Sequence, residues 1–215
     1  MAAWSLTPPE GHGVVFSSDG GGGSTVLLPR TTRNYAGAST AAVVTSSARQ
    51  TVVLYDGPQV VASADTVHAP LAATALPLGD GAGPPLIAVA EGDQLSVWDL
   101  TRTKTPVTRT SVGAGLLRAV AADGSGGALF TAGDERSVYV INPRTWRVDG
   151  AWPGALKYGV GTLIPSAARP GVVFAASLTD SELSAGSCFK DKSRVRRMES
   201  KERCQVRFLF FSHIF

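Results

Sequence analysis

A step of forty-three residues recurs along this chain of 215 residues and constrains its fold more than any other feature. Residues Gly92 to Asp99 form the clearest unit: the pattern predicts a tight turn, a short strand of alternating residues and a closing Trp98-Asp99 pair. A fixed period in the forties built from short strands predicts a repeat protein whose units are small sheets. The markers that keep this step are Tyr55-Asp56, Trp98-Asp99 and Ile141-Asn142, and also Asp80-Gly81 and Asp123-Gly124.

Each unit is expected to contribute up to four short strands, and the whole chain is expected to be all-β. The 24 glycines and 13 prolines indicate many turns, and no window has the pattern of a long amphipathic helix. A hairpin is expected over 13–28, but it does not fit the register, so the first unit is expected to be atypical or partial. The expected strands are 41–45, 51–55 and 58–62; 71–76, 86–90, 94–98 and 106–108; 116–121, 128–131, 138–141 and 146–148; and 158–163 and 172–176.

The repeat pattern stops near Ser184, so we divide the chain into a repeat domain, 1–184, and a tail, 185–215. The domain has twelve basic and fourteen acidic residues, whereas the tail has eight basic and three acidic residues and holds Cys188 and Cys204. We expect the tail to be disordered, and we expect the fourth unit to lack its third strand. A repeat interrupted in this way indicates a truncated form of a longer protein. Two functional interpretations of the tail stay open, a nucleic-acid or nuclear-localisation patch at 190–197 and a membrane contact at 206–215.

The composition is typical of a soluble protein, with 44% hydrophobic and 17% charged residues. No segment reaches the eighteen or so apolar residues that a membrane span needs. The first residues do not have the pattern of a secretory signal, since Thr7-Pro8-Pro9-Glu10 follows at once. We therefore expect a cytoplasmic or nuclear protein. The Ser/Thr-rich first fifty residues leave an organelle transit peptide open.

The period, the Asp-Gly turns and the Val97-Trp98-Asp99 ending resemble WD40-repeat (transducin-like) β-propellers over roughly residues 40–183. The resemblance implies a partial, unclosed propeller of about three to four four-stranded blades. It also implies a structural hydrogen-bonded set of His, Ser/Thr, Asp and Trp in each blade. His68, Asp93 and Trp98 match three of these places, with Asp99 closing the motif, while the strand-two place falls within 86–90 and has no hydroxyl. Thr131 and Asp134 match in the next unit, where Ile141 replaces the Trp.

No catalytic, cofactor-binding or metal-binding residues are predicted. The three histidines are far apart in the sequence, the cysteines lack a CxxC spacing, and the glycine run 20–23 lacks the Gly-Lys-Ser/Thr ending of a phosphate loop. We therefore expect a non-enzymatic scaffold that binds a protein partner, for example through loops 77–85 and 122–127. The alternatives are a propeller-type small-ligand binder or enzyme fragment, and nucleic-acid binding through the tail. An unclosed propeller leaves its end blades half-covered, so we expect marginal stability alone or dependence on a partner.

Overall fold

The computed structural model describes residues 25–28, 41–56, 59–76, 86–99, 105–113, 115–187 and 196–199. The regular elements of these residues are sixteen β-strands, which form four four-stranded antiparallel sheets. In each sheet consecutive strands are neighbours, so that the chain runs back and forth through one sheet before it enters the next.

We number the sheets along the chain. Sheet 1 contains β1 (Thr25–Leu28), β2 (Ala41–Ser46), β3 (Thr51–Asp56) and β4 (Gln59–Asp65). Sheet 2 contains β5 (Pro70–Leu76), β6 (Leu86–Glu91), β7 (Gln94–Trp98) and β8 (Thr108–Ser111). Sheet 3 contains β9 (Leu117–Ala122), β10 (Leu129–Gly133), β11 (Val138–Asn142) and β12 (Arg147–Trp152). Sheet 4 contains β13 (Val160–Pro165), β14 (Val172–Ser177), β15 (Glu182–Ser187) and β16 (Arg196–Glu199).

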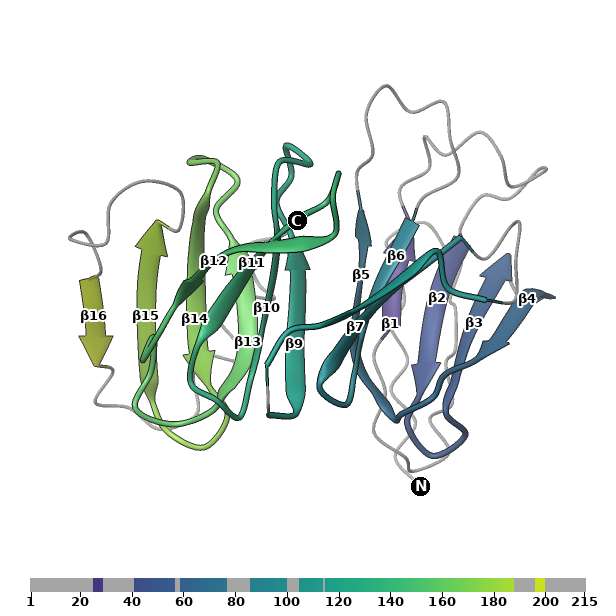
Figure 1. Ribbon diagram of the computed structural model, residues 1–215, viewed down its shortest axis with the longest axis horizontal. Coiled ribbons are helices and arrows are strands. Elements are labelled where there is room, and N and C mark those ends of the chain that lie inside the picture. Colours follow the sequence, from purple (N-terminus) through teal and green to yellow (C-terminus); the bar gives the residue numbers. More distant parts are fainter. Residues whose placement is uncertain are drawn as a thin grey trace, which may run out of the picture.

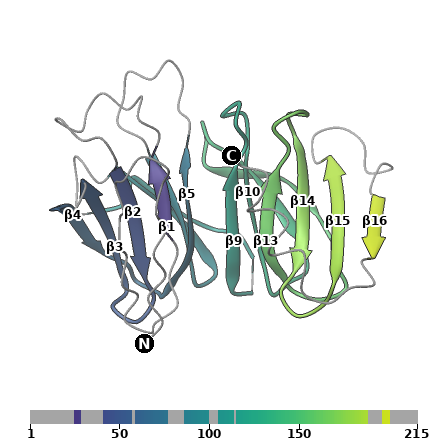
Figure 2. The same ribbon diagram turned by 180° about the vertical axis from the view of Figure 1, so that it is seen from behind.

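The four sheets stand side by side, with sheets 1 and 4 at opposite ends of the row (Figure 1). The first strand of each sheet lies toward its neighbours, since β5 contacts both β1 and β9, and β9 contacts β13. The same order is visible from behind (Figure 2). This arrangement confirms the predicted fold class, all-β with an unclosed series of blade-like sheets.

Three apolar cores fill the spaces between successive sheets. Alternate residues of a strand point to opposite faces, so one strand contributes to two cores. In β7, Trp98 packs toward sheet 1, whereas Leu95 and Val97 pack toward sheet 3. In β10, Phe130 packs toward sheet 4 and Leu129 toward sheet 2. The central strands are therefore covered on both faces, which is why 86–90 reads as a continuous apolar run.

The strand predictions for the two middle units are confirmed to within a few residues. The largest shifts are in the outer strands: 106–108 was expected where β8 is Thr108–Ser111, and 146–148 was expected where β12 is Arg147–Trp152. The first unit was expected to be atypical or partial, and it is not partial, because β1 pairs with β2 and completes a four-stranded sheet. The expected strand 13–16 and loop 77–85 lie outside the described residues.

The prediction that the fourth unit lacks its third strand is also wrong. β15 pairs with β14 from Val172↔Ser187 to Ala176↔Leu183, across the predicted boundary at 184. Its buried side chains are Glu182 and Ser184, with Gly186 next along the same face. A strand whose buried face is polar or lacks a side chain does not show the apolar alternation that predicts strands. β16 then pairs with β15 inside the segment that was predicted to be disordered.

Candidate interaction surface

At one end of their strands, the sheets present the turns between second and third strands together with the loops between sheets. Backbone hydrogen bonds connect these segments: Thr66 N–H donates to the Gln50 carbonyl (2.7 Å), and Leu117 N–H donates to the Gly92 carbonyl (2.7 Å). Leu178 N–H donates to the Gly159 carbonyl (3.1 Å) in sheet 4. We call this end the turn end. All the sequence-predicted motif residues except Trp98, Asp99 and Thr131 lie there.

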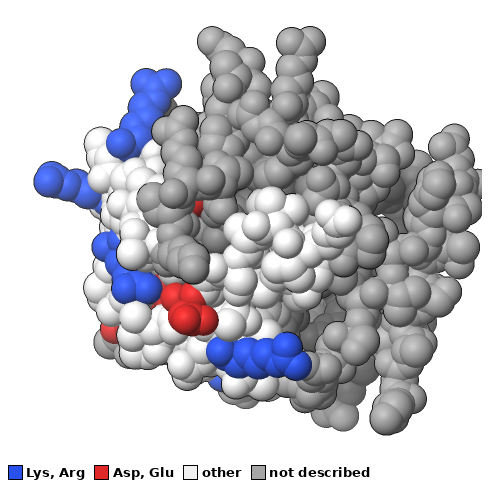
Figure 3. Space-filling model, turned by 90° about the vertical axis from the view of Figure 1, so that its right-hand side faces the viewer, with Lys and Arg blue, Asp and Glu red and all other residues white. Residues whose placement is uncertain are grey.

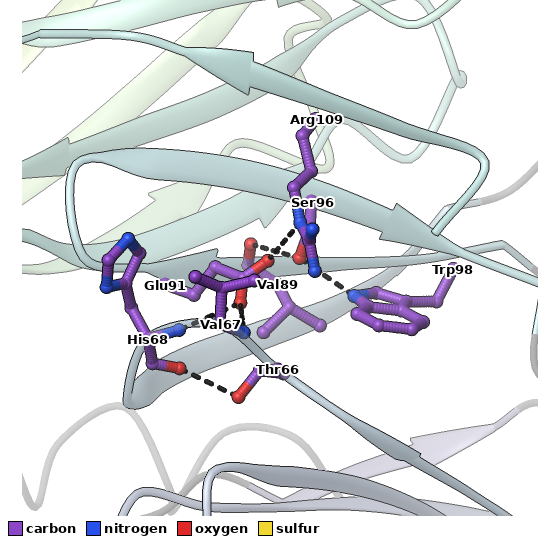
Figure 4. Close-up of polar contacts among 8 residues, drawn as sticks. All are labelled: Thr66, Val67, His68, Val89, Glu91, Ser96, Trp98 and Arg109. Atoms are coloured by element: carbon purple, nitrogen blue, oxygen red, sulfur yellow. Dashed lines mark hydrogen bonds and ion pairs between the residues drawn. The ribbon is translucent and has the colours of Figure 1, made fainter. Parts of the chain in front are cut away.

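Trp98 is fully buried, and its indole N–H is satisfied from its own strand. Nε1 donates to Ser96 Oγ at 2.8 Å, and Ser96 Oγ donates to the Val89 carbonyl at 3.5 Å (Figure 4). Residues two apart in a strand share one face, so Ser96 can reach the indole. The hydroxyl missing from the second strand is therefore supplied by the third strand, two residues before Trp98.

Glu91 is the central polar residue of the turn end in sheet 2, although its side chain is completely buried. Oε2 accepts hydrogen bonds from the backbone N–H groups of Val67 (3.0 Å) and His68 (3.5 Å). Oε1 accepts one from Arg109 Nε at 3.2 Å, and the guanidinium carbon of Arg109 lies 5.9 Å from the centroid of the Trp98 ring. Figure 4 shows these contacts together. A buried carboxylate that accepts from three donors, one of them a cation, is compensated, and it holds the loop between sheets 1 and 2 in place.

His68 and Asp93 both lie at the turn end, and the contacts shown there involve the backbone and ring of His68 and the carbonyl of Asp93. The hydrogen-bonded set of side chains that includes them stays a prediction. The His68 ring covers Gly92, where an added Cβ would lie 3.1 Å from ring atoms, and Gly92 has φ +61°. The His68 carbonyl accepts from Thr66 Oγ1 (2.7 Å), and the Asp93 carbonyl accepts from Val112 N–H (3.2 Å). Asp99 is buried directly after β7. In sheet 2, hydrogen bonds that were expected within the predicted set of His, Ser/Thr, Asp and Trp are therefore made with Glu91 and Ser96. The sequence analysis did not identify these two residues.

In sheet 3, Thr131 and Asp134 bind separate partners. Thr131 Oγ1, fully buried, donates to the Ala119 carbonyl at 2.9 Å, and Asp134 pairs with Arg118 Nε at 2.5 Å. The neighbouring Glu135 carboxylate accepts a hydrogen bond from the Tyr139 hydroxyl. This bond, together with burial and the charge of Glu135, raises the pKa of Tyr139 above its ordinary value, because each favours the neutral phenol.

The position of Glu135 repeats a feature of sheets 2 and 4. Its side chain lies against the loop entering sheet 3, where a Cβ added at Gly113 or Gly115 would meet it at 2.6 or 2.8 Å. In sheet 4, Glu182 Oε2 accepts from Lys157 N–H at 2.6 Å. Lys157 stands three residues before β13, as Val67 stands three before β5. Sheets 2, 3 and 4 therefore each have a glutamate at the turn between the second and third strands, and its side chain lies against the loop that enters the sheet.

Exposed apolar and basic side chains meet at the turn end between sheets 3 and 4. Arg136 Nη1 lies 3.5 Å from the Lys157 carbonyl, and Lys157 Nζ lies 5.2 Å from the centroid of the Tyr158 ring. Tyr158 and Leu178 are each 44% exposed. We call Arg136, Lys157, Tyr158 and Leu178 the sheet 3–4 patch. The ion pairs shown between described residues use Arg109 and Arg118, so neither cation of the patch takes part in them.

Arg136 also has an unusual backbone conformation, with φ +60°. The corresponding turn of sheet 2 places Gly92 (φ +61°) in this left-handed region. An L-residue pays about 1–2 kcal/mol there, and strain of this kind is frequent at functional positions. The turn of sheet 3 thus keeps a cationic side chain where a glycine would relieve strain.

The described residues contain no group of three or more His, Cys, Asp or Glu side chains placed to hold a metal ion. No helix among them could cross a membrane. The predicted recognition loop 122–127 is a tight turn at the opposite end of the sheets, in which Asp123 Oδ2 accepts from Ser125 Oγ at 2.6 Å. Asp123 is buried, whereas Gly124 and Ser125 are exposed, so the role of this loop in recognition stays a prediction.

Comparison with known proteins supports the fold and leaves the family open. No protein-family model matches the chain, and no curated protein matches it. By structure, 1058 chains of solved structures match, so the fold alone does not specify one activity. One belongs to the "Crystal Structure of Mitotic Checkpoint Complex", with 16% identity and a TM-score of 0.59. The match covers 74% of this chain and 49% of that chain, so this chain spans about half of it.

Proposed function

We propose that this chain is part of a WD40-type propeller and acts as a non-enzymatic scaffold that binds a protein partner. The forty-three-residue step, the Trp98-Asp99 ending and the four-stranded sheets support the family assignment. The similar chain comes from a structure whose title describes a complex, which is in keeping with a scaffold role. On the same reasoning the remaining blades belong to a longer form of the protein, and the cytoplasm or nucleus is the proposed compartment.

The observation that carries the proposal is the sheet 3–4 patch. Its four side chains come from three separate segments, and two are cations beside exposed apolar groups. Aromatic and arginine side chains are enriched among the residues that dominate binding energy in protein interfaces. The hydrogen-bonded turn end holds these segments in fixed positions, so that the patch is presented with little loss of entropy on binding.

The test compares proteins captured by the intact chain with those captured by an Arg136→Glu/Lys157→Glu variant. The matched control is Arg144→Glu/Arg169→Glu, because these two exposed arginines lie in turns at the opposite end of the sheets. We expect the patch variant to lose a set of proteins that the control keeps, and a purified member of that set to bind at least tenfold more weakly to the patch variant. Identical capture by all three proteins would refute the proposal.

A further inference from the structure

β4 is the outer strand of sheet 1, and its chemistry differs from that of the other outer strands. It reads Gln59-Val60-Val61-Ala62-Ser63-Ala64-Asp65, so no charge occurs before its last residue. β8 contains Arg109, β12 contains Arg147 and Asp149, and β16 contains two arginines and a glutamate. Charges on outer strands prevent the exposed backbone from pairing with another chain. Among the described strands, β4 is therefore the outer edge least protected against strand addition.

The valines of β4 are strongly exposed. Val60 is 58% and Val61 is 52% exposed, although both belong to a β-strand. Figure 3 faces the side of the molecule on which β4 lies; residues other than Lys, Arg, Asp and Glu make up much of the described surface there, with an acidic group between them and basic groups toward its margins. In strand addition, the backbone of an edge strand supplies hydrogen-bonding groups, and its exposed apolar side chains supply contacts to the added strand.

A comparison with β12 isolates the difference between the two edges. Both strands carry a bulge at the same place: Val61 is the extra residue between the pairs Tyr55↔Val60 and Leu54↔Ala62, and Asp149 is the extra residue between Ile141↔Val148 and Val140↔Gly150. The exposed valines Val60 and Val148 therefore correspond. In β12 the bulge carries a carboxylate, whereas in β4 it carries a valine. Both outer strands therefore have the bulge, but only β12 carries a charged residue at it.

We propose that the edge of β4 binds an extended segment of a partner protein as a fifth strand of sheet 1. The segment would carry β-branched or other apolar residues opposite Val60 and Val61, with a basic residue near the exposed Asp65. Charge complementarity favours this occupant over a second copy of the chain. Two β4 strands paired antiparallel about Ala62 would place Asp65 opposite the uncharged Gln59. The inference rests on the proposed scaffold function but uses a different surface.

The experiment measures binding of a fluorescein-labelled peptide, one lysine followed by alternating valine and threonine over seven residues, by fluorescence anisotropy. The control peptide has alternate amides N-methylated, which removes the donors of one edge. Val61→Asp gives β4 the bulge charge of β12. Val148→Asp is the control on β12, one residue before the bulge, because the bulge residue of that strand, Asp149, already carries a carboxylate. We expect the intact chain to bind the unmodified peptide, with at least tenfold weaker binding for the methylated peptide or for Val61→Asp, and a change below twofold for Val148→Asp.

Several outcomes would overturn the inference. These are absence of saturable peptide binding, equal binding of the methylated peptide, and an equal effect of Val61→Asp and Val148→Asp. A chain that sediments as a dimer, and becomes monomeric on Val61→Asp, would assign the edge to a second copy instead. The variant with Arg136→Glu and Lys157→Glu should still bind the peptide. Failure at β4 with the patch-dependent capture intact would therefore remove this inference and leave the proposed function standing.

Discussion

Replacing Glu91 with alanine is expected to release the loop between sheets 1 and 2. The carboxylate is fully buried and is the acceptor for two backbone N–H groups, those of Val67 and His68, and for Arg109 Nε. The alanine variant removes all three bonds at once. It also leaves the two N–H groups without the acceptor that fixes the loop.

The magnitude follows from the geometry of the three bonds. The Val67 bond is short, at 3.0 Å, whereas the His68 bond at 3.5 Å is weak. Hydrogen bonds to charged groups contribute about 1.5–3 kcal/mol, and removing one partner of a buried ion pair costs about 3–5 kcal/mol. The Arg109 side chain is 32% exposed, so it can regain water and the upper figure is reduced. We expect a loss of about 3 kcal/mol for Glu91→Ala.

Hydrogen exchange at the loop measures this loss where it occurs. A loss of about 3 kcal/mol in the free energy of local opening corresponds to exchange that is on the order of 100-fold faster. The Val67 amide should show this change, and the urea midpoint should fall. Asp180→Ala is the control, because that exposed carboxylate lies in the equivalent turn of sheet 4. It should change the free energy of unfolding by less than about 0.5 kcal/mol.

One result would refute the reasoning about Glu91. If Glu91→Ala left the exchange of the Val67 amide within about threefold of the intact chain, the carboxylate would not hold the loop. Glu182→Ala offers an independent check in sheet 4, where the Lys157 amide should exchange faster for the same reason.

Three further predictions concern other positions. Gly133→Ala should lower the free energy of unfolding by about 3 kcal/mol, since its Cβ would lie 1.8 Å from the Leu116 carbonyl oxygen; Gly124→Ala, with nothing within 4 Å, is the control in urea titrations. The raised pKa of Tyr139 means that the unfolded chain ionises first as pH rises, so stability should fall above about pH 10, and Tyr139→Phe should flatten that fall. Arg136→Gly should stabilise the fold by about 0.5 kcal/mol, because the relieved backbone strain slightly exceeds the entropy cost of glycine. The same variant should weaken partner capture. A loss of stability would contradict the reasoning about strain.

The strands of the middle sheets could be predicted because their signal is local. Strand formation follows the alternation of residues within five or six positions, and turns follow Gly and Asp at fixed places. The same logic failed for β15, whose buried face is Glu182, Ser184 and Gly186. The space beside Gly186 is occupied instead by Trp152, to which an added Cβ would approach within 2.8 Å. The apolar group that covers this strand comes from another sheet, so the strand itself carries no apolar signal.

The predicted motif residues illustrate the same limit. Trp98 was identified correctly as a buried strand residue, but its acceptor, Ser96, was not, because several hydroxyls near it in sequence could serve. Glu91 looks in sequence like an exposed turn residue. Only the packing of sheet 1 against sheet 2 buries it and brings the Val67 amide, twenty-four residues away, to its carboxylate.

By itself, the amino-acid sequence determined the all-β class, the period of the sheets and the strands of the two middle sheets, because these depend on short-range patterns of apolar side chains. The tertiary structure alone decided how the sheets are connected at the turn end, which cations and apolar groups meet in the sheet 3–4 patch, and that β4 is an uncharged edge. These features depend on contacts between segments far apart in the chain, and no local pattern encodes which segments will meet.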